Sequence, residues 1–203
     1  YQEDIYVGYR YFETVAKEKV MYPFGYGLSY TEFEEEVADF QENKGEIILT
    51  VKVRNTGNRN GRQVVQIYVE APQGKLGKPA RVLAEFGKTR QLEPGEKEEL
   101  KFHILPYTFA SYDDQGLTGH AYSYVLESGK YRVYAGKNVR DAICAGTFCL
   151  EEVRIIEQLS QNMAPILPFQ RMKPQAPAEG KDGWRMTFEE VPLGEKEDQI
   201  KRS

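Results

Sequence analysis

Residues 47–54 read Ile-Ile-Leu-Thr-Val-Lys-Val-Arg, and this stretch decides the fold class. Apolar side chains at positions 47, 49, 51 and 53 alternate with a second set that is mostly polar. Successive side chains of a strand point to opposite faces, so this period of two predicts a strand with one buried and one wet face. Residues 55–61 are rich in asparagine and glycine and predict a turn, after which residues 63–70 resume the alternation. We therefore expect a β-hairpin over 47–70.

Short apolar runs separated by turn residues continue on the C-terminal side of this stretch. They predict strands at 82–86, 100–104, 121–126, 131–135 and 143–150. No helical period lies between them, and at least seven short strands are expected. This pattern indicates an all-β chain that forms an antiparallel two-sheet sandwich of the immunoglobulin or fibronectin type III kind. Tyr131 lies in a late strand, at a position where the tyrosine hydroxyl of such sandwiches often hydrogen-bonds to the backbone of a corner.

Residues 22–31, Tyr-Pro-Phe-Gly-Tyr-Gly-Leu-Ser-Tyr-Thr, lie on the N-terminal side of the strands and predict an aromatic turn. Pro23 fixes its own φ, and Gly25 and Gly27 allow positive φ, so the segment should fold back and fan its rings outward. Large rings favour a packed joint between two bodies; the alternative is the wall of a sugar-binding cleft. The candidate residues for a domain interface or a substrate-cleft rim are Tyr22, Phe24, Tyr26, Tyr30 and, as an ion-pair or stacking anchor, Arg10.

Composition excludes several classes of protein. The 203 residues are 40% hydrophobic and 12% aromatic, enough for a globular core. A net charge of −4 lacks the basic excess of a nucleic-acid-binding surface, and no run approaches the roughly 18 apolar residues of a membrane span. Cys144 and Cys149, five apart on one strand, should point to opposite faces without bridging. As buried or half-buried thiols they favour a cytoplasmic location.

Motifs for catalysis, cofactors or metals are not recognisable in the chain. Gly25-Tyr26-Gly27 lacks the third glycine of a dinucleotide loop, and Ser29 has neither an elbow motif nor a nearby histidine. Two cysteines without clustered histidines do not predict a metal site. The carboxylates lie in solvated runs such as 34–36 or in turns. We therefore assign no catalytic residue, no metal and no cofactor.

The aromatic turn also carries a resemblance. Residues 6–10, Tyr-Val-Gly-Tyr-Arg, followed by 22–31, closely resemble the segment that ends the α/β-sandwich domain of glycoside hydrolase family 3, the β-glucosidase family. In that family the segment leads into a fibronectin type III-like domain, and residues 51–69, 92–96 and 129–141 resemble strands and turns of this domain. The resemblance covers about residues 3–150.

The resemblance implies a role for the chain. A retaining glycosidase needs two carboxyl groups about 5–5.5 Å apart, and the family places the nucleophile on a barrel domain and the acid/base on the α/β sandwich. Neither segment occurs here, so the chain is expected to be a non-catalytic scaffold that contacts both domains of a parent that hydrolyses β-glucosides or related β-glycosides. The alternative is an independent carbohydrate-binding or adhesive sandwich, which would need an exposed aromatic platform.

The chain divides into three parts by composition. Residues 1–31 are expected to be the tail of a preceding α/β-sandwich domain, with a short helix or turn, followed by the linker turn. Residues 32–153 are the expected sandwich, and 154–203 a linker and lead-in to a following domain. Four prolines in 164–183 predict an extended linker. Residues 154–163 before it predict an edge strand or a short helix. Residues 184–203 after it predict a short extended piece followed by a charged, helical end. Residues 187–195 resemble the lead-in to the barrel in permuted members of the family, where the barrel comes last. A start at Tyr1 indicates a piece of a longer protein.

Overall fold

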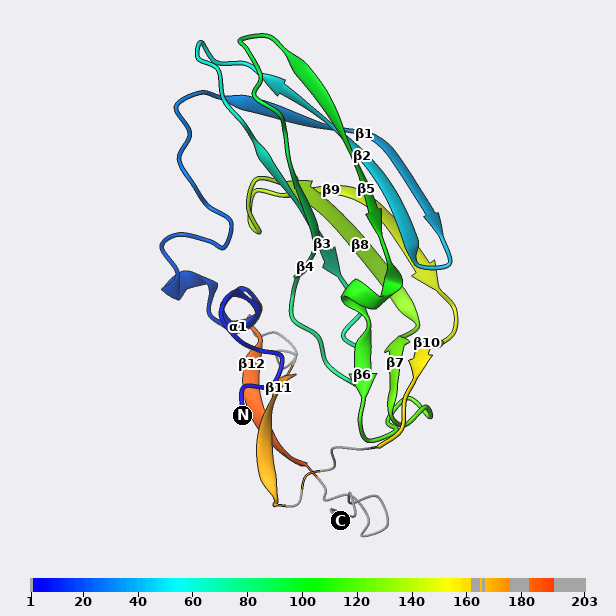
Figure 1. The fold of residues 1–203 in the computed structure, drawn as a ribbon. Helices are drawn as coiled ribbons and strands as arrows, with labels where there is room; N and C mark the ends of the chain where they lie inside the picture. Colours follow the sequence, from blue (N-terminus) through cyan, green and yellow to red (C-terminus); the bar gives the residue numbers. More distant parts are fainter. Residues whose placement is uncertain (1, 162–164, 166, 176–182, 192–203) are drawn as a thin grey trace, which may run out of the picture.

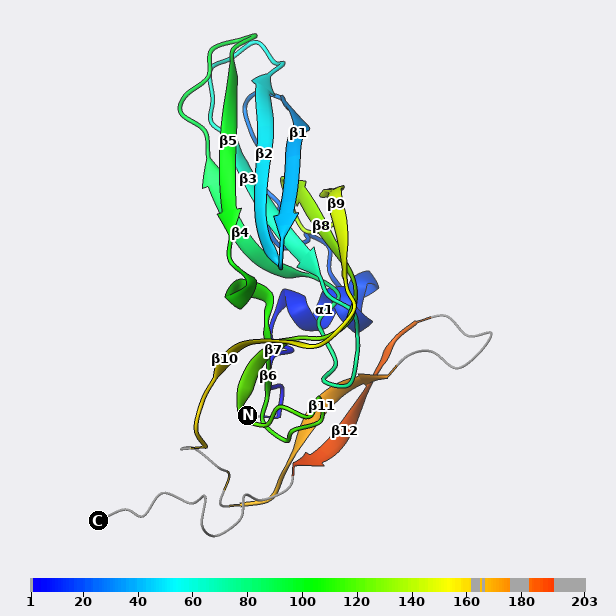
Figure 2. The same ribbon diagram turned by 90° about the vertical axis from the view of Figure 1, so that its right-hand side faces the viewer.

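Two antiparallel sheets form the main body of the computed structural model, which describes residues 2–161, 165, 167–175 and 183–191. The first sheet has the strand order β1-β2-β5 and the second β4-β3-β8-β9. Figures 1 and 2 show the two sheets face to face, which confirms the predicted all-β sandwich. The strands are β1 (Phe33–Asn43), β2 (Glu46–Asn55), β3 (Val64–Glu70), β4 (Val82–Lys88), β5 (Lys97–Ile104), β8 (Gly129–Gly136) and β9 (Ile143–Leu150).

The core lies between these sheets and follows the alternation of the sequence. Ile47, Leu49, Val51 and Val53 of β2 are between 0% and 1% exposed. Alternate residues of β3 and β8 meet them from the other sheet in one hydrophobic cluster. Burying one such side chain contributes about 1.5–3 kcal/mol, so the sandwich supplies its own stability.

The predicted hairpin over 47–70 is wrong, because β2 and β3 belong to different sheets. Both edges of β2 are already paired, one with β1 and the other with β5, while β3 pairs with β4 and β8. The chain instead crosses between the sheets, and each strand buries its apolar face in the shared core. Asn55, which is fully buried, holds this crossing. Its Nδ2 donates to the carbonyls of Arg59 (2.7 Å) and Leu92 (2.9 Å), and its Oδ1 accepts from the Gly57 amide (3.1 Å).

Tyr131 makes the predicted corner. Its hydroxyl donates to the carbonyl of Glu127 at 2.8 Å, and the residue is fully buried. The ring stacks on Phe148 of β9 with centroids 4.8 Å apart. A buried phenol needs such a partner, so this bond fixes the link between β7 (Ser123–Leu126) and β8.

A second layer of short elements lies below the sandwich in Figure 1. The strand β7 pairs with β6 (Ser111–Asp113) on one side and with β10 (Arg154–Gln158) on the other, which confirms the strand alternative for residues after 153. The helix α1 (Tyr9–Val15) confirms the helix expected near the N-terminus. Two 3-10 turns complete the layer, η1 (Lys17–Lys19) and η2 (Pro106–Phe109).

The linker predicted for 164–183 is wrong over 169–175. There β11 (Phe169–Gln175) pairs antiparallel with β12 (Arg185–Val191) in a two-stranded sheet. Pro174 fits because such a sheet has only edge strands, where a missing N–H is tolerated. The extended piece predicted after Trp184 is confirmed as β12, while the charged end at 192–203 lies outside the described residues.

The two cysteines are unbridged, as predicted, but the predicted burial is wrong because both are exposed. β9 is an edge strand, and its pairing with β8 shifts register between Val133 and Tyr134, so that Ala145 is skipped. This bulge breaks the strict alternation on which the predicted burial depended. Within the described ranges, no helix is long and apolar enough to span a bilayer.

Candidate functional site

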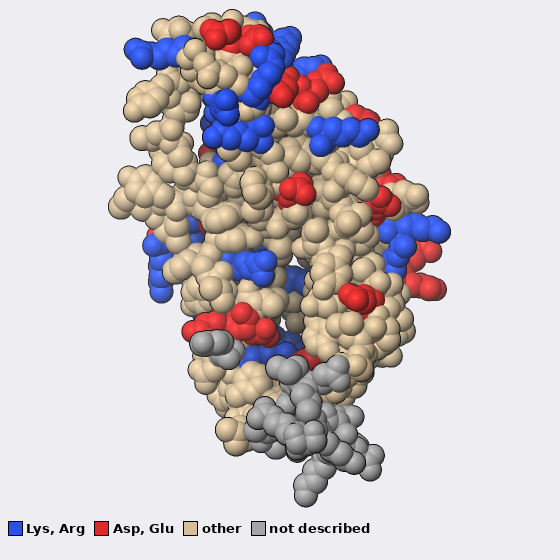
Figure 3. All heavy atoms as spheres, viewed as in Figure 1, with Lys and Arg blue, Asp and Glu red and all other residues tan. Residues whose placement is uncertain are grey.

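The aromatic turn, residues 22–31, and the preceding Met21 form an exposed apolar strip beside the sandwich. Figure 3 shows mostly uncharged side chains along the left edge, where Figure 1 places this segment, while acidic and basic side chains intermingle at the top and right. Exposed fractions range from 42% to 92% for its large apolar side chains, which are Met21, Tyr22, Phe24, Tyr26, Leu28 and Tyr30. Contiguous apolar surface on a folded domain marks an interaction site.

The backbone of the aromatic turn is fixed even though its side chains are exposed. The Val139 amide donates to the Phe24 carbonyl at 3.0 Å, and the Phe24 ring stacks on Tyr9 with centroids 4.3 Å apart. Gly25 has φ +84°, and a Cβ there would lie 2.2 Å from the amide oxygen of Gln66. Only glycine fits this position, because both the dihedral and the contact exclude a side chain.

The structure brings together only some of the predicted site residues. The rings of Tyr22 and Tyr26 lie 5.1 Å apart, Phe24 turns back onto Tyr9, and Tyr30 is 92% exposed. Arg10 is not part of this surface. It lines a separate pocket, so the structure does not bring it together with the rings of the turn, and its role as an ion-pair or stacking anchor stays a prediction.

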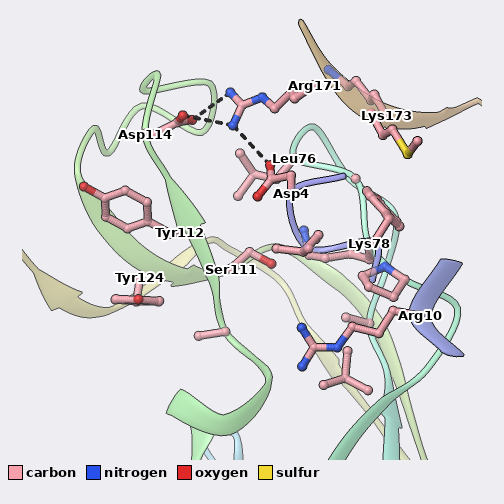
Figure 4. A pocket seen from close by; sticks show the side chains of 18 of the residues that line it. Asp4, Arg10, Leu76, Lys78, Ser111, Tyr112, Asp114, Tyr124, Arg171 and Lys173 are labelled. Atoms are coloured by element: carbon pink, nitrogen blue, oxygen red, sulfur yellow. Dashed lines mark hydrogen bonds and ion pairs between the residues drawn. The ribbon is translucent and has the colours of Figure 1, made fainter. Parts of the chain in front are cut away.

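That pocket, of about 540 Å³, lies between the N-terminal segment, the loop before β4, the η2–β6 connection and β11. Figure 4 shows Arg10 reaching toward it from α1, with Ser111 and Tyr112 on the β6 side and Arg171 above. These elements are far apart in sequence. The pocket therefore exists only because the C-terminal hairpin folds back onto the start of the chain.

Arg171 of β11 makes that contact. Its two terminal nitrogens donate to Asp114 at 2.9 and 3.0 Å, and one lies 3.5 Å from Asp4. The next residue, Met172, donates its amide to the Gln2 carbonyl at 2.8 Å. Burial alone would lower the pKa of Arg171, but the two carboxylates raise it above its ordinary value. Bidentate pairing of this kind is both strong and geometrically specific.

A buried ion pair supports the lower side of the pocket. Lys78 and Glu127 form an ion pair, each with a side chain only 5% exposed. The Glu127 carboxylate also accepts the backbone amide of Lys75 at 2.6 Å, so it fixes the loop before β4. Burial lowers the pKa of Lys78, although Glu127 opposes this shift. Each of the two charges is neutralised by the other, so neither is free to bind a ligand. The pair therefore holds the loop before β4 in place.

The carboxylates that line the pocket show no arrangement for acid/base catalysis. Asp4 and Asp114 share the guanidinium of Arg171, and Glu189 pairs with Lys173 at 2.6 Å. An ion pair with a cation stabilises the ionised form of a carboxylate, so such a carboxylate is poorly suited to donate a proton. These carboxylates therefore have a structural role. The local geometry therefore supports binding or docking.

Comparisons with known proteins agree with this arrangement. Residues 63–139 match the family model of the fibronectin type III-like domain. The chain is 46% identical over 202 residues to a β-glucosidase from Ruminococcus albus, with all of this chain and 20% of the relative aligned. The chain belongs to the fibronectin type III-like domains of glycoside hydrolase family 3.

Solved structures place this fibronectin-like domain in the same group. It superposes on the crystal structure of a β-glucosidase from Paenibacillus barengoltzii with a TM-score of 0.89 at 43% identity, covering 96% of this chain and 22% of that one. β-Glucosidase 3B from Thermotoga neapolitana, solved with α-D-glucose, gives a TM-score of 0.68 at 39% identity and covers 77% and 21%. The fibronectin-like domain thus spans about a fifth of the length of its relatives.

Sequence reasoning missed the residues that build the pocket. Asp114 lies in a stretch without a recognisable motif, and Arg171 lies within residues 164–183, which predict a linker. Lys78 and Glu127 are 49 positions apart, and their pairing has no local signal. Only knowledge that β11 returns to residues 2–4 would have connected these residues.

Proposed function

We propose that this fibronectin-like domain is a non-catalytic scaffold in a β-glucosidase-like hydrolase and that its aromatic turn docks on the catalytic domains of the same polypeptide. The observation that carries the proposal is the exposed apolar surface from Met21 to Tyr30, on a turn whose backbone is bonded to the sandwich at Phe24 and Gly25. Aromatic rings bury about 150–250 Å² each, so docking would remove a large apolar area from water. The parent would hydrolyse β-glucosides or related β-glycosides with retention.

Pre-ordering of the turn supports docking. Its carbonyls at Phe24 and Gly25 are already bonded to the sandwich, by Val139 and by Gln66. A partner would therefore meet a turn whose centre, around Phe24 and Gly25, is already ordered, which lowers the entropic cost of association. Relatives about five times as long as this chain provide the additional surface.

We also propose the domain order of the permuted members, with the α/β sandwich before residue 1 and the barrel after residue 203. The division of the chain at 31 and 153 is part of this proposal. The β-glucosidases of R. albus and P. barengoltzii align with 100% and 96% of the chain, but that of T. neapolitana with 77%. The difference is about the length of residues 154–203. Peptide mapping of the intact parent tests the order, and barrel peptides preceding residue 1 would contradict it.

A cytoplasmic location completes the proposal. Its support is that Cys144 and Cys149 are unbridged and exposed, and exposed thiols persist best in a reducing compartment. Fractionation of the producing cells, with the parent enzyme detected by antibody, tests this point. Recovery of the parent enzyme in the extracellular medium instead of the cytoplasmic fraction would contradict it.

The docking experiment uses the parent polypeptide with Leu28→Asp and Tyr30→Asp. Both side chains are more than 90% exposed here, so the 203-residue chain should keep its melting temperature. The parent should lose thermal stability and aryl β-glucosidase activity, because the charges would be buried against the catalytic domains. The matched control is Ile155→Asp on β10, also exposed and on the opposite side of the molecule (Figure 1). Equal effects of both changes on the parent would contradict docking through the turn.

The carbohydrate-binding alternative rests on the paired rings of Tyr22 and Tyr26. Titration of the 203-residue chain with glucose, cellobiose and xylobiose, followed by NMR amide shifts, separates the two functions. We expect no saturable shift in residues 22–31 and no hydrolysis of an aryl β-glucoside. Saturable shifts there would favour a sugar-binding module, and hydrolysis that survives repurification would contradict the scaffold.

A further inference from the structure

We propose that the pocket beside Arg10 binds a small hydroxylated anion of the size of a sugar acid or sugar phosphate. Its volume of about 540 Å³ falls in the range of about 300–1,000 Å³ typical of small-molecule sites. It is distinct from the aromatic turn, and it does not depend on the scaffold function. The proposal rests on three features of its lining: an unpaired cation, an unpartnered buried hydroxyl and an aromatic wall.

Arg10 is the unpaired cation. Within the described part of the chain its guanidinium has no hydrogen-bond or ion-pair partner, and Figure 4 shows it extending toward the pocket that it lines. The other cations of the lining all have carboxylate partners. These pairs are Arg171 with Asp114, Lys173 with Glu189 and Lys78 with Glu127. The Arg10 guanidinium is therefore the one cation of the described lining whose donors are free, while Asp4 and Asp114 share Arg171. A guanidinium fork matches a carboxylate or phosphate.

Tyr6 supplies the unpartnered hydroxyl. The residue is 4% exposed and lines the pocket, yet its phenol oxygen has no hydrogen-bond partner among the described residues. Burial raises the pKa of Tyr6, with Asp4 adding to the shift, so the group stays a neutral donor. Leaving a buried hydroxyl unbonded is costly. A ligand hydroxyl or carboxylate in the pocket would satisfy it.

Aromatic rings form the remaining wall. The rings of Tyr112 and Tyr124 lie 5.3 Å apart and both line the pocket, and Tyr107 packs on the other side of Tyr124 at 4.6 Å. Ser111 adds a hydroxyl between this wall and Arg10 (Figure 4). Apolar ring faces combined with a few convergent polar groups suit a polyhydroxylated molecule. The anionic group would lie at Arg10 and the hydroxylated part against the rings.

The test is a titration of the 203-residue chain with four probes: sodium gluconate, glucose 6-phosphate, glucose and inorganic phosphate. We expect saturable NMR shifts in residues 4–10 and 76–80 with gluconate or glucose 6-phosphate, and the stronger of these two identifies the anionic group. Glucose and inorganic phosphate should each bind at least about tenfold more weakly, since each lacks one of the two recognised features.

Two variants make the test specific. Arg10→Gln should weaken binding by about tenfold, the loss of one charge-assisted contact, whereas Arg62→Gln, an exposed arginine outside the pocket, should leave it unchanged. Tyr6→Phe removes only the unpartnered oxygen, so it should weaken binding about threefold while the melting temperature stays equal or rises. Absence of saturable shifts with all four probes, equal binding of glucose, or unchanged binding by Arg10→Gln would overturn the proposal. Binding of inorganic phosphate as tight as that of glucose 6-phosphate would also overturn it.

Discussion

Leu49 and Leu28 illustrate how differently two regions of this molecule treat the same side chain. Leu49, in the sandwich core, is 0% exposed, whereas Leu28, in the aromatic turn, is 91% exposed. The first lies in a closed cluster that needs nothing outside the domain. The second lies in a turn that is bonded to the sandwich at Phe24 and leaves this side chain uncovered. The contrast indicates that the sandwich is folded for its own stability and the turn for contact with another surface.

The most direct way to break this comparison is to shorten both leucines. Leu49→Ala should lower the free energy of unfolding by about 2–5 kcal/mol, because it leaves a cavity between two packed sheets. Leu28→Ala should stay within about 0.5 kcal/mol, as an exposed change does. Urea denaturation of the 203-residue chain measures both. A loss at Leu28 comparable to that at Leu49 would mean that the turn is buried by the domain itself.

A buried polar link joins the two regions, and its removal should have the second largest effect. The Thr31 hydroxyl, at the end of the aromatic turn, donates to Asn55 Oδ1 at 2.9 Å. Asn55→Ala would leave this hydroxyl and the carbonyl of Arg59 without their partner, for an expected loss of about 2–3 kcal/mol in urea denaturation.

The matched control is Asn60→Ala on the same crossing. Among the described residues its side-chain amide makes a single exposed contact, to Glu93 at 3.4 Å, so the change should stay within about 0.5 kcal/mol. If Asn55→Ala were as mild as this control, the crossing would be held by the strands alone.

The same contrast explains what the sequence could predict. The alternation at 47–54 and the spacing of turn residues identified the sandwich, because strand burial follows a local period of two. Even the hydrogen bond of Tyr131 could be anticipated from its place in a late strand. The partner of a strand is not local, however. Nothing in residues 55–61 distinguishes a hairpin from a crossing between sheets, since both need the same turn residues.

Site residues could be predicted only where they lie together in one continuous segment of the sequence. The exposed rings of the aromatic turn were recognised because proline and two glycines exclude regular structure there. The pocket of Arg10 was not, because it depends on Arg171 returning from the far end of the chain to Asp114. Prolines near that arginine also suggested a linker, and composition could not show that β12 would pair with this segment.

Arg171 allows a sharper test of how the C-terminal hairpin is attached. Arg171→Met keeps the side-chain stem but removes the bonds to Asp114 and Asp4. We expect the local opening free energy of β11 to fall by about 1–2 kcal/mol, while the core keeps its protection because the sandwich does not depend on the hairpin. Hydrogen exchange of the Met172 amide, which bonds to Gln2, reports this opening.

Lys173→Met is the control for the hairpin. Its ion pair with Glu189 lies within the two-stranded sheet and does not reach the N-terminal segment. It should therefore leave the attachment intact. If Lys173→Met opened β11 as much as Arg171→Met, the contact with Asp114 would not be what fastens the hairpin.

The smallest expected effect concerns pH and Glu35 on β1. Burial raises the pKa of this carboxyl above its ordinary 4.5, although a hydrogen bond from Gln63 at 2.6 Å and the charge of Lys137 oppose the shift. The folded chain therefore holds this proton to a higher pH than the unfolded chain. Its contribution to stability is present below pH 4.5 and is lost as the pH rises through the folded pKa. Glu35→Gln cannot ionise and still accepts the bond from Gln63, so it should stabilise the chain at pH 7 but not at pH 4.

Urea denaturation at pH 4 and pH 7 measures this change in stability. Glu36→Gln is the matched control, because it shows whether the gain comes from the burial of Glu35 or from the lower net charge of the chain. Glu36 is exposed on the same strand, and its replacement removes the same charge. If burial is the cause, only Glu35→Gln gains stability between pH 4 and pH 7. An equal gain in both variants would instead assign the effect to general repulsion in an acidic chain of net charge −4. In that case the Glu35 carboxyl would behave as a solvent-facing group, like the exposed side chains of the aromatic turn.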